Sequence, residues 1–113
     1  MNSLRNRVQL IGRLGQDPDV KQLDSGKTVV NMSLATSDNY QDNQGNRVED
    51  TQWHNLVAWG KQAEIAEKFL NKGKEVAIEG RLVHRTYEDK EGKKRYVSEV
   101  LINEIVMVGK KGE

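Results

Sequence analysis

Alternation of apolar and polar side chains with a period of two runs through most of this 113-residue chain and constrains its fold more than any other feature. Such alternation is typical of β-strands with one buried face. It predicts strands at residues 4–14, 28–37, about 48–60, 75–87 and 95–108. Residues 61–72 change to a helical period, with residues 65, 66, 69 and 70 on one apolar stripe, and Gly73 follows as a C-terminal stop.

The order of these segments is three strands, one helix and two strands. It matches a mainly β fold, a five-stranded OB-fold barrel with one α-helix between strands three and four. A helix-capped β-sandwich would produce much the same pattern. The length suits one core rather than two domains. We expect one OB-fold domain over residues 1–108 and a frayed C-terminal end at residues 109–113.

Composition and charge exclude several classes of function. The 18 basic and 17 acidic residues leave a net charge of +1, so binding of a polyanion would depend on where the cations lie. The absence of cysteine removes disulfides and thiolate metal sites. The longest apolar run, residues 105–108, is far too short to span a membrane, and arginines interrupt the N-terminal segment. We therefore expect a cytoplasmic protein.

The titratable side chains do not assemble a catalytic centre. His54 and His84 are the only histidines, and neither has partners at a spacing suited to a metal site or an acid–base pair. Asp17 and Asp19 flank a proline in a turn, and two carboxylates without a third ligand make a poor nuclease site. We expect no enzyme activity, no cofactor and no metal.

Trp53 and Trp59 are the only tryptophans, and their even spacing places both rings on one face of a strand, about 20 Å apart. On a wet face they would form a platform for stacking unpaired bases. On a dry face they would be core residues, the commoner position for such side chains. Arg81, Arg85 and Tyr87 share one parity of a later strand, and this mixture of cations and a ring favours the wet face.

Three other segments carry weaker signals. Residues 38–50 are almost wholly polar around one aromatic, Tyr40, and indicate a long exposed loop or a flexible hairpin tip. Residues 88–94 are a charged tip whose lysines are either solvated or in contact with phosphates. The last strand is apolar on both faces in its second half, which indicates burial against another element or subunit.

Specific blocks occur at residues 11–20 (IGRLGQDPDV), 34–37 (LATS), 53–54 (WH), 59–64 (WGKQAE) and 72–82 (KGKEVAIEGRL). With them, the chain resembles the bacterial single-stranded DNA-binding protein family from about residue 2 to residue 107. The resemblance implies an OB-fold homotetramer that binds single-stranded DNA without sequence preference. It also implies protection of that DNA in replication, recombination and repair, in the nucleoid of the bacterial cytoplasm.

The resemblance also implies site residues by position. The base-stacking rings would be Tyr40, Trp53, Trp59 and Tyr87. The phosphate contacts would include Arg5, Lys61, Lys72, Arg81 and Arg85. His54 would lie near a subunit interface. Well-known family members carry tryptophan at positions 40 and 87 and phenylalanine at position 59, so the rings are kept while their stacking strength differs.

The family usually continues into a disordered linker with an acidic tip that recruits other proteins, whereas this sequence stops at Glu113. Replication and repair proteins are therefore expected as partners only if the native protein has such a tail. Either a trimmed domain or a short paralogue fits the sequence. A second hypothesis is an OB-fold protein-binding adaptor of a replication-restart complex, which predicts a tryptophan face packed against protein.

Overall fold

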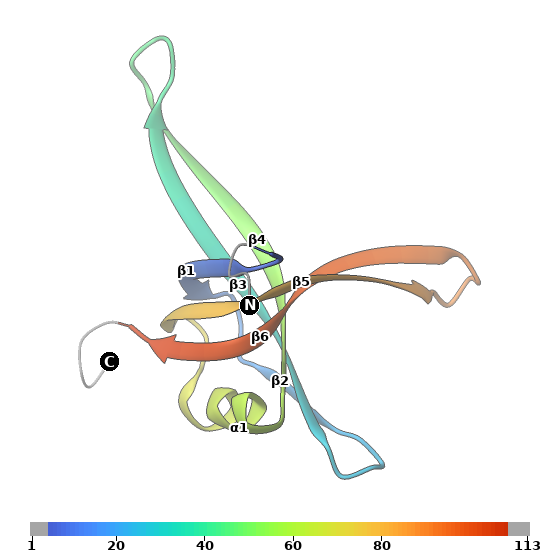
Figure 1. Cartoon of the computed structure of the whole chain (residues 1–113). Helices are drawn as coiled ribbons and strands as arrows, with labels where there is room; N and C mark the ends of the chain where they lie inside the picture. Colours follow the sequence, from blue (N-terminus) through green and yellow to red (C-terminus); the bar gives the residue numbers. More distant parts are fainter. Residues whose placement is uncertain (1–4, 109–113) are drawn as a thin grey trace.

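The computed structural model describes residues 5–108, which form six strands and one helix (Figure 1). They are β1 (Val8–Leu14), β2 (Asp19–Gln22), β3 (Thr28–Gln41), β4 (Arg47–Trp59), α1 (Gly60–Phe69), β5 (Glu75–Glu88) and β6 (Lys94–Met107). All five predicted strands and the helix are present, and the short β2 was not predicted. The expected frayed end and the first four residues of the expected domain lie outside the described residues.

Five of the strands close into a barrel. The sheet runs in the order β1-β5-β6-β4-β3, and β1 pairs back with β3 through Leu14 and Leu34. A short parallel contact joins β4 to β6 at Leu56 and Val100, and β2 extends β3 on its far side. The predicted closed barrel with a helix after its third strand is confirmed, because β2 lies outside the ring of five strands. The β1–β3 closure separates this fold from a helix-capped sandwich.

Alternation along the barrel strands fills the core. Leu34, Leu56, Val30 and Val76 are its largest fully buried side chains. All four occupy even-numbered positions. The period-two pattern predicted an apolar side for Val30, Leu34 and Val76, whereas on the strand of Leu56 it left open which side is buried. Removing such side chains from water supplies the main stabilisation of the barrel.

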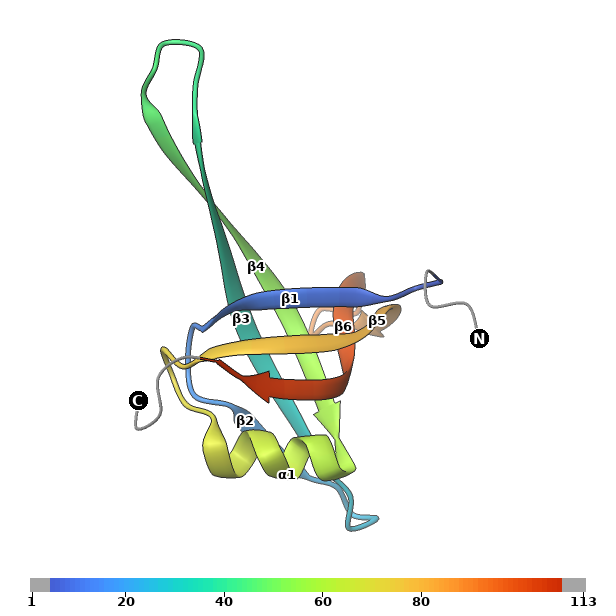
Figure 2. The same cartoon turned by 60° about the vertical axis from the view of Figure 1, so that its left-hand side comes forward.

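The helix lies across one end of the barrel, below the strands in Figure 2. It buries Ala63 and Ala66, whereas Phe69 of the predicted apolar stripe is 56% exposed. The helix ends at Phe69 rather than at residue 72, because the chain then turns toward the barrel, where the Gly73 N–H donates to the Leu14 carbonyl at 2.8 Å. Within residues 5–108, no helix is long and apolar enough to cross a membrane.

Two long hairpins leave the barrel in different directions (Figure 1). The strands β3 and β4 stay paired as far as Gln41 and Arg47, and β5 and β6 as far as Glu88 and Lys94. Residues 38–50 are therefore a paired hairpin with a short tip, which agrees with the hairpin alternative of the prediction and not with the long loop. Cross-strand hydrogen bonds hold these polar strands in register without a buried face.

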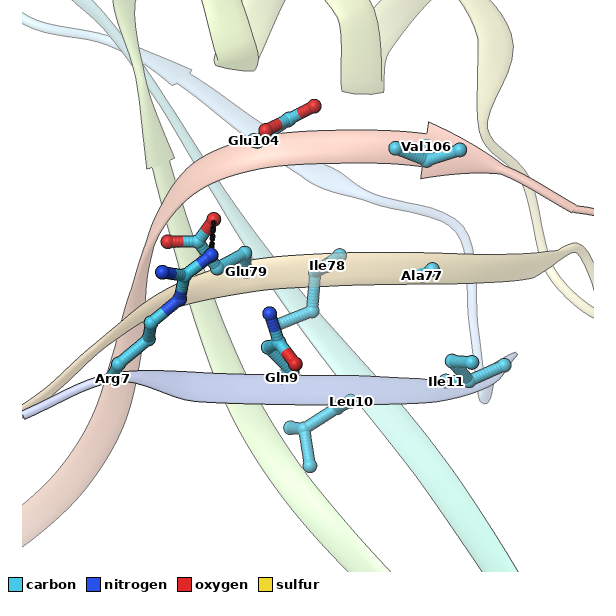
Figure 3. A pocket seen from close by; sticks show the side chains of 9 residues that line it. All are labelled: Arg7, Gln9, Leu10, Ile11, Ala77, Ile78, Glu79, Glu104 and Val106. Atoms are coloured by element: carbon cyan, nitrogen blue, oxygen red, sulfur yellow. Dashed lines mark hydrogen bonds and ion pairs between the residues drawn. The ribbon is translucent and has the colours of Figure 1, made fainter. Parts of the chain in front are cut away.

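The outer face of β1, β5 and β6 carries an apolar row. Ile11 pairs with Ala77, and Ala77 pairs with Val106, so the three side chains line up across three strands (Figure 3). Ile11 is 62% exposed and Val106 is 51% exposed. An ion pair of 3.1 Å between Arg7 and Glu79 flanks the row (Figure 3). The two-sided apolar character of the last strand thus leaves an uncovered face in the single chain.

Candidate nucleic-acid interface

Both tryptophans project from the outer face of β4, away from the core. Leu56 and Ala58, at the alternate positions of this strand, are buried. Trp53 is 60% exposed and Trp59 is 42% exposed. The structure therefore decides between the two interpretations of the tryptophan pair: neither ring is a core residue, and both are accessible to a ligand.

Trp53 is held in place by the connection between β1 and β2. A Cβ atom built on Gly15 would lie 2.5 Å from Cζ3 of the Trp53 ring. The Gly15 N–H also donates to the Ser33 carbonyl at 3.0 Å, which fixes the glycine against β3. A larger residue at position 15 would displace the ring from this position. The ring is therefore restrained on one side and open on the other.

Trp59 lies at a groove that crosses the outer faces of four strands. The groove is lined by Val29, Asn31, Val57, Trp59, Val83, Arg85, Glu99 and Leu101. A second hollow on Trp59 is lined by Gly26, Lys27, Thr28, Gly60 and Glu64. Sequence reasoning missed Lys27, a cation beside a candidate stacking ring. Only the pairing of β3 with β4 reveals that Lys27 is near this ring, because Val29 lies opposite Trp59 and brings the preceding turn to it.

The predicted residues of β5 share this outer face. Arg81 pairs with Leu101 of the groove, and Tyr87 is 48% exposed farther along the hairpin. Arg85 donates through Nε to Glu99 at 2.8 Å, and its guanidinium carbon lies 5.9 Å from the centre of the Tyr87 ring. The hydrogen bond and the charge of Glu99 raise the pKa of Arg85. A phosphate at Arg85 would therefore compete with Glu99, a residue that sequence reasoning missed.

Tyr40 lies on the other face of the β3–β4 hairpin. It has the same parity along β3 as the buried Leu34, whereas Trp53 pairs with Ala35. Tyr40 is 53% exposed and borders a hollow that Arg47 also lines. The structure thus brings three of the four predicted rings to one face and places the fourth on the reverse of the same hairpin.

The remaining predicted phosphate contacts are exposed and lie at three separate places. Lys61 is in the first turn of α1, two residues after Trp59. The backbone N–H of Lys72 donates to Asp17 at 2.8 Å, which places Lys72 beside the connection that supports Trp53. Arg5 precedes Asn6, whose side chain hydrogen-bonds the backbone of Leu82 at the edge of β5. These cations surround the barrel rather than forming one patch.

The histidines are engaged in hydrogen bonds between strands. Nε2 of His54 lies 2.9 Å from Oγ1 of Thr36, on the face of β4 opposite the tryptophans. Nδ1 of His84 lies 2.8 Å from Oγ of Ser98. Across residues 5–108, no group of three histidine, aspartate or glutamate side chains gathers where it could hold a metal ion.

A closed barrel with exposed rings and arginines on one outer face is a surface suited to binding unpaired nucleic acid. The Single-strand binding protein family matches residues 5–108 of the sequence. The chain belongs to this family.

Named relatives agree with this membership. "Single-stranded DNA-binding protein 1" of Chlorobaculum tepidum is 48% identical over 94% of this chain and 66% of its own length. The protein of the same name from Xylella fastidiosa is 46% identical over 94% of this chain and 79% of its own length. This chain therefore spans slightly less than two thirds of the first relative. The solved structure "Plasmodium falciparum SSB complex with ssDNA" matches 96% of this chain and 100% of its own, with a TM-score of 0.83 and 29% identity.

Proposed function

We propose that this chain is a non-enzymatic OB-fold domain that binds single-stranded DNA without sequence preference. The observation that carries the proposal is the continuous outer face on which Trp53, Trp59 and Tyr87 are all exposed beside arginines. The names of the relatives and the DNA in the solved complex support the choice of ligand. Its role is to protect exposed strands during replication, recombination and repair in the bacterial cytoplasm, where the nucleoid lies.

Binding combines two kinds of contact. Each aromatic ring stacks one base, which contributes about 1 to 3 kcal/mol and tolerates any base because every base has a π-face. Arg81 and the cations near the tryptophans neutralise phosphates and release counterions. Arg85 exchanges its Glu99 partner for a phosphate as the strand enters the groove. This binding scheme includes no catalytic step.

The position of Tyr40 constrains the path of the DNA. Because Tyr40 and Trp53 lie on opposite faces of one hairpin, a strand that stacks on both must pass around the edge of that hairpin. Unpaired DNA is flexible enough for this path, whereas a rigid duplex is not. The proposed selectivity for single strands therefore comes from the curved path as well as from access to the bases.

Tryptophan fluorescence during titration with oligothymidine tests the proposal. Binding should quench the emission, because both tryptophans lie on the proposed contact face. The logarithm of the affinity should fall with the logarithm of the salt concentration, with a slope of about −0.7 for each phosphate engaged. Unchanged emission and no binding at low salt would contradict the proposal. That result would favour the protein-binding adaptor, for which the tryptophans pack against another protein.

We further propose that the chain assembles as a homotetramer. The apolar row of Ile11, Ala77 and Val106 supports self-association, since an uncovered apolar sheet face is a common protein interface. We place His54 near a subunit contact, on the strength of family resemblance. Replication and repair proteins join the proposal as partners only if the native protein carries the family's acidic tail.

Light scattering tests the assembly. Ile11→Glu should dissociate the oligomer, because it buries a charge in the proposed interface. Gln9→Glu is the matched control, since Gln9 is exposed two residues earlier on the same face of β1 but lies outside the apolar row. A monomeric wild-type protein would remove this part of the proposal while leaving DNA binding to its own test.

A further inference from the structure

Tyr96 is the most exposed large hydrophobic side chain among the described residues, with 76% of its surface accessible. It lies on β6, near the tip of the β5–β6 hairpin. Neither the sequence reasoning nor the proposed contact face includes it. A ring this exposed adds little to the stability of the single chain. Any binding role for it depends on the chemistry of the residues around it.

Strand pairing places Tyr96 on the reverse of the hairpin from Tyr87. Tyr96 lies opposite Thr86, whereas Tyr87 lies opposite Arg95. Adjacent positions of a strand point to opposite faces. The two tyrosines are therefore separated by one layer of backbone, and a strand leaving Tyr87 around the edge or tip of the hairpin would meet Tyr96.

The charges around Tyr96 suit a phosphate. Nζ of Lys94 lies 5.9 Å from the centre of the Tyr96 ring. On the face of the hairpin that carries Tyr87, Arg85 forms an ion pair with Glu99, and Arg95 forms one with Asp89. Within the described part of the chain, Lys94 takes part in no ion pair. Glu88 lies opposite Lys94 in the strand pairing, but these two described residues make no ion pair with each other. A ring with such a cation beside it provides both contacts that single-strand binding uses.

The other hairpin also presents an aromatic ring on each of its faces. Trp53 is exposed on one face of the β3–β4 hairpin, and Tyr40 is exposed on the other, beside Arg47. Tyr40 and Tyr96 both continue the side of their strands that is buried inside the barrel. Each hairpin thus presents a ring on both faces. Arg47 borders the same hollow as Tyr40 but pairs with Gln41, so alternation places it on the Trp53 face, whereas Lys94 lies on the same face as Tyr96.

We propose that the reverse face of the β5–β6 hairpin, centred on Tyr96 and Lys94, is a second base-stacking site for single-stranded DNA. It is reached only by a strand long enough to pass from the outer face around the hairpin. The inference rests on the proposed function and adds a site and a path to it. It predicts that Tyr96 affects long oligonucleotides and not short ones.

The test compares two lengths of oligothymidine by equilibrium titration. The short one has about 8 nucleotides, within the roughly 4 to 16 that one OB fold covers, and the long one has about 32. Tyr96→Ala should weaken binding of the long oligonucleotide about fivefold or more, the lower limit for removal of one base stack. Binding of the short oligonucleotide should change less than about twofold. Tyr96→Phe keeps the ring and should match the wild type on both.

Two further measurements test whether Tyr96 contacts the DNA directly. Photocrosslinking of the wild-type protein to a long oligothymidine containing 5-iodouracil should label Tyr96, and the short form should not. Light scattering should show the same assembly for Tyr96→Ala as for the wild type. A changed assembly would overturn the inference, because it would mean that the ring packs against a second copy of the chain.

The outcomes separate this inference from the proposed function. Normal binding of the short oligonucleotide together with an unchanged affinity of Tyr96→Ala for the long one would overturn the second site alone. A wild-type protein that bound neither length would overturn the proposed function and the second site with it. Absence of the Tyr96 crosslink in a protein that binds the long form would also exclude the reverse face.

Discussion

The β3–β4 and β5–β6 hairpins have the same tip and opposite charge. At the first tip, Asp42 accepts backbone N–H groups of Gln44 and Asn46 at 2.9 Å. At the second, Asp89 accepts the corresponding groups two and four residues later, also at 2.9 Å. Glycines with φ of 82° and 81° complete the two turns at residues 45 and 92. The shared Asp-x-x-Gly pattern therefore determines the backbone of both tips.

The charges of the two hairpins differ. The β3–β4 hairpin carries Asp38, Asp42, Glu49 and Asp50 against Arg47. The β5–β6 hairpin carries Arg81, Arg85, Lys90, Lys93, Lys94 and Arg95 against Glu88, Asp89, Glu91 and Glu99. Rings are exposed on both hairpins, so stacking is common to them, while attraction of phosphates falls mainly to the second. The two hairpins, which we also call arms, thus have similar backbones but contribute differently to the proposed DNA binding.

The largest expected effect concerns the barrel that supports both arms. Leu34 is fully buried where β3 pairs with β1. Leu34→Ala should lower the free energy of unfolding by about 2 to 5 kcal/mol, because it leaves a cavity in the core. Asn39→Ala, exposed farther along β3, is the control and should cost far less. Urea denaturation measures both free energies of unfolding. Equal losses would mean that residues of the β3–β4 hairpin contribute as much to stability as residues of the barrel core.

The next effect tests whether stacking is shared. Trp53→Ala and Tyr87→Ala should each reduce DNA affinity by about 1 to 3 kcal/mol. Neither should lower the unfolding free energy much, since both rings are exposed. Trp53→Phe keeps a ring and controls for the loss of stacking. Oligothymidine titrations give the affinities; if one substitution had no effect, only one arm would contribute stacking.

A smaller effect tests the division of charge. Arg81→Gln should reduce the magnitude of the salt slope by about 0.7, the value expected when one phosphate is no longer neutralised. Glu49→Gln, on the acidic arm, should leave the slope unchanged and strengthen binding slightly by removing repulsion. Titrations across several salt concentrations measure both slopes. A change in slope for Glu49→Gln as large as that for Arg81→Gln would contradict this division of charge between the two hairpins.

Much of this arrangement was predictable from sequence. The strands, the helix and the common face of Trp53 and Trp59 follow from periodicity, because alternation and helical spacing are local properties. The accessibility of that face does not follow, since it depends on which strands close the barrel. The short β2, the Arg85–Glu99 ion pair and the reverse position of Tyr40 all require the pairing register, which no local pattern specifies.

The smallest expected effect concerns the acidity of the two tips. The backbone N–H of Asn46 is the main cause that lowers the pKa of Asp42. The guanidinium of Arg95, 2.8 Å from Asp89, is the main cause that lowers the pKa of Asp89, and the Lys93 backbone adds to it. A carboxyl whose folded pKa is lowered stabilises the fold above its unfolded pKa, near 3.9, and that contribution is lost as the pH falls through the folded value.

Arg95→Gln separates the two tips. It should raise the pKa of Asp89 by removing its charged partner, while the pKa of Asp42 stays where its backbone donors set it. Acid destabilisation of the second tip should then begin at a higher pH than in the wild type. Carboxyl-detected NMR titration follows the two groups in one sample. An unchanged pKa of Asp89 would mean that the Asp-x-x-Gly turn alone sets the acidity of both tips. The difference in charge between the two hairpins would then have no effect on the aspartates of the turns.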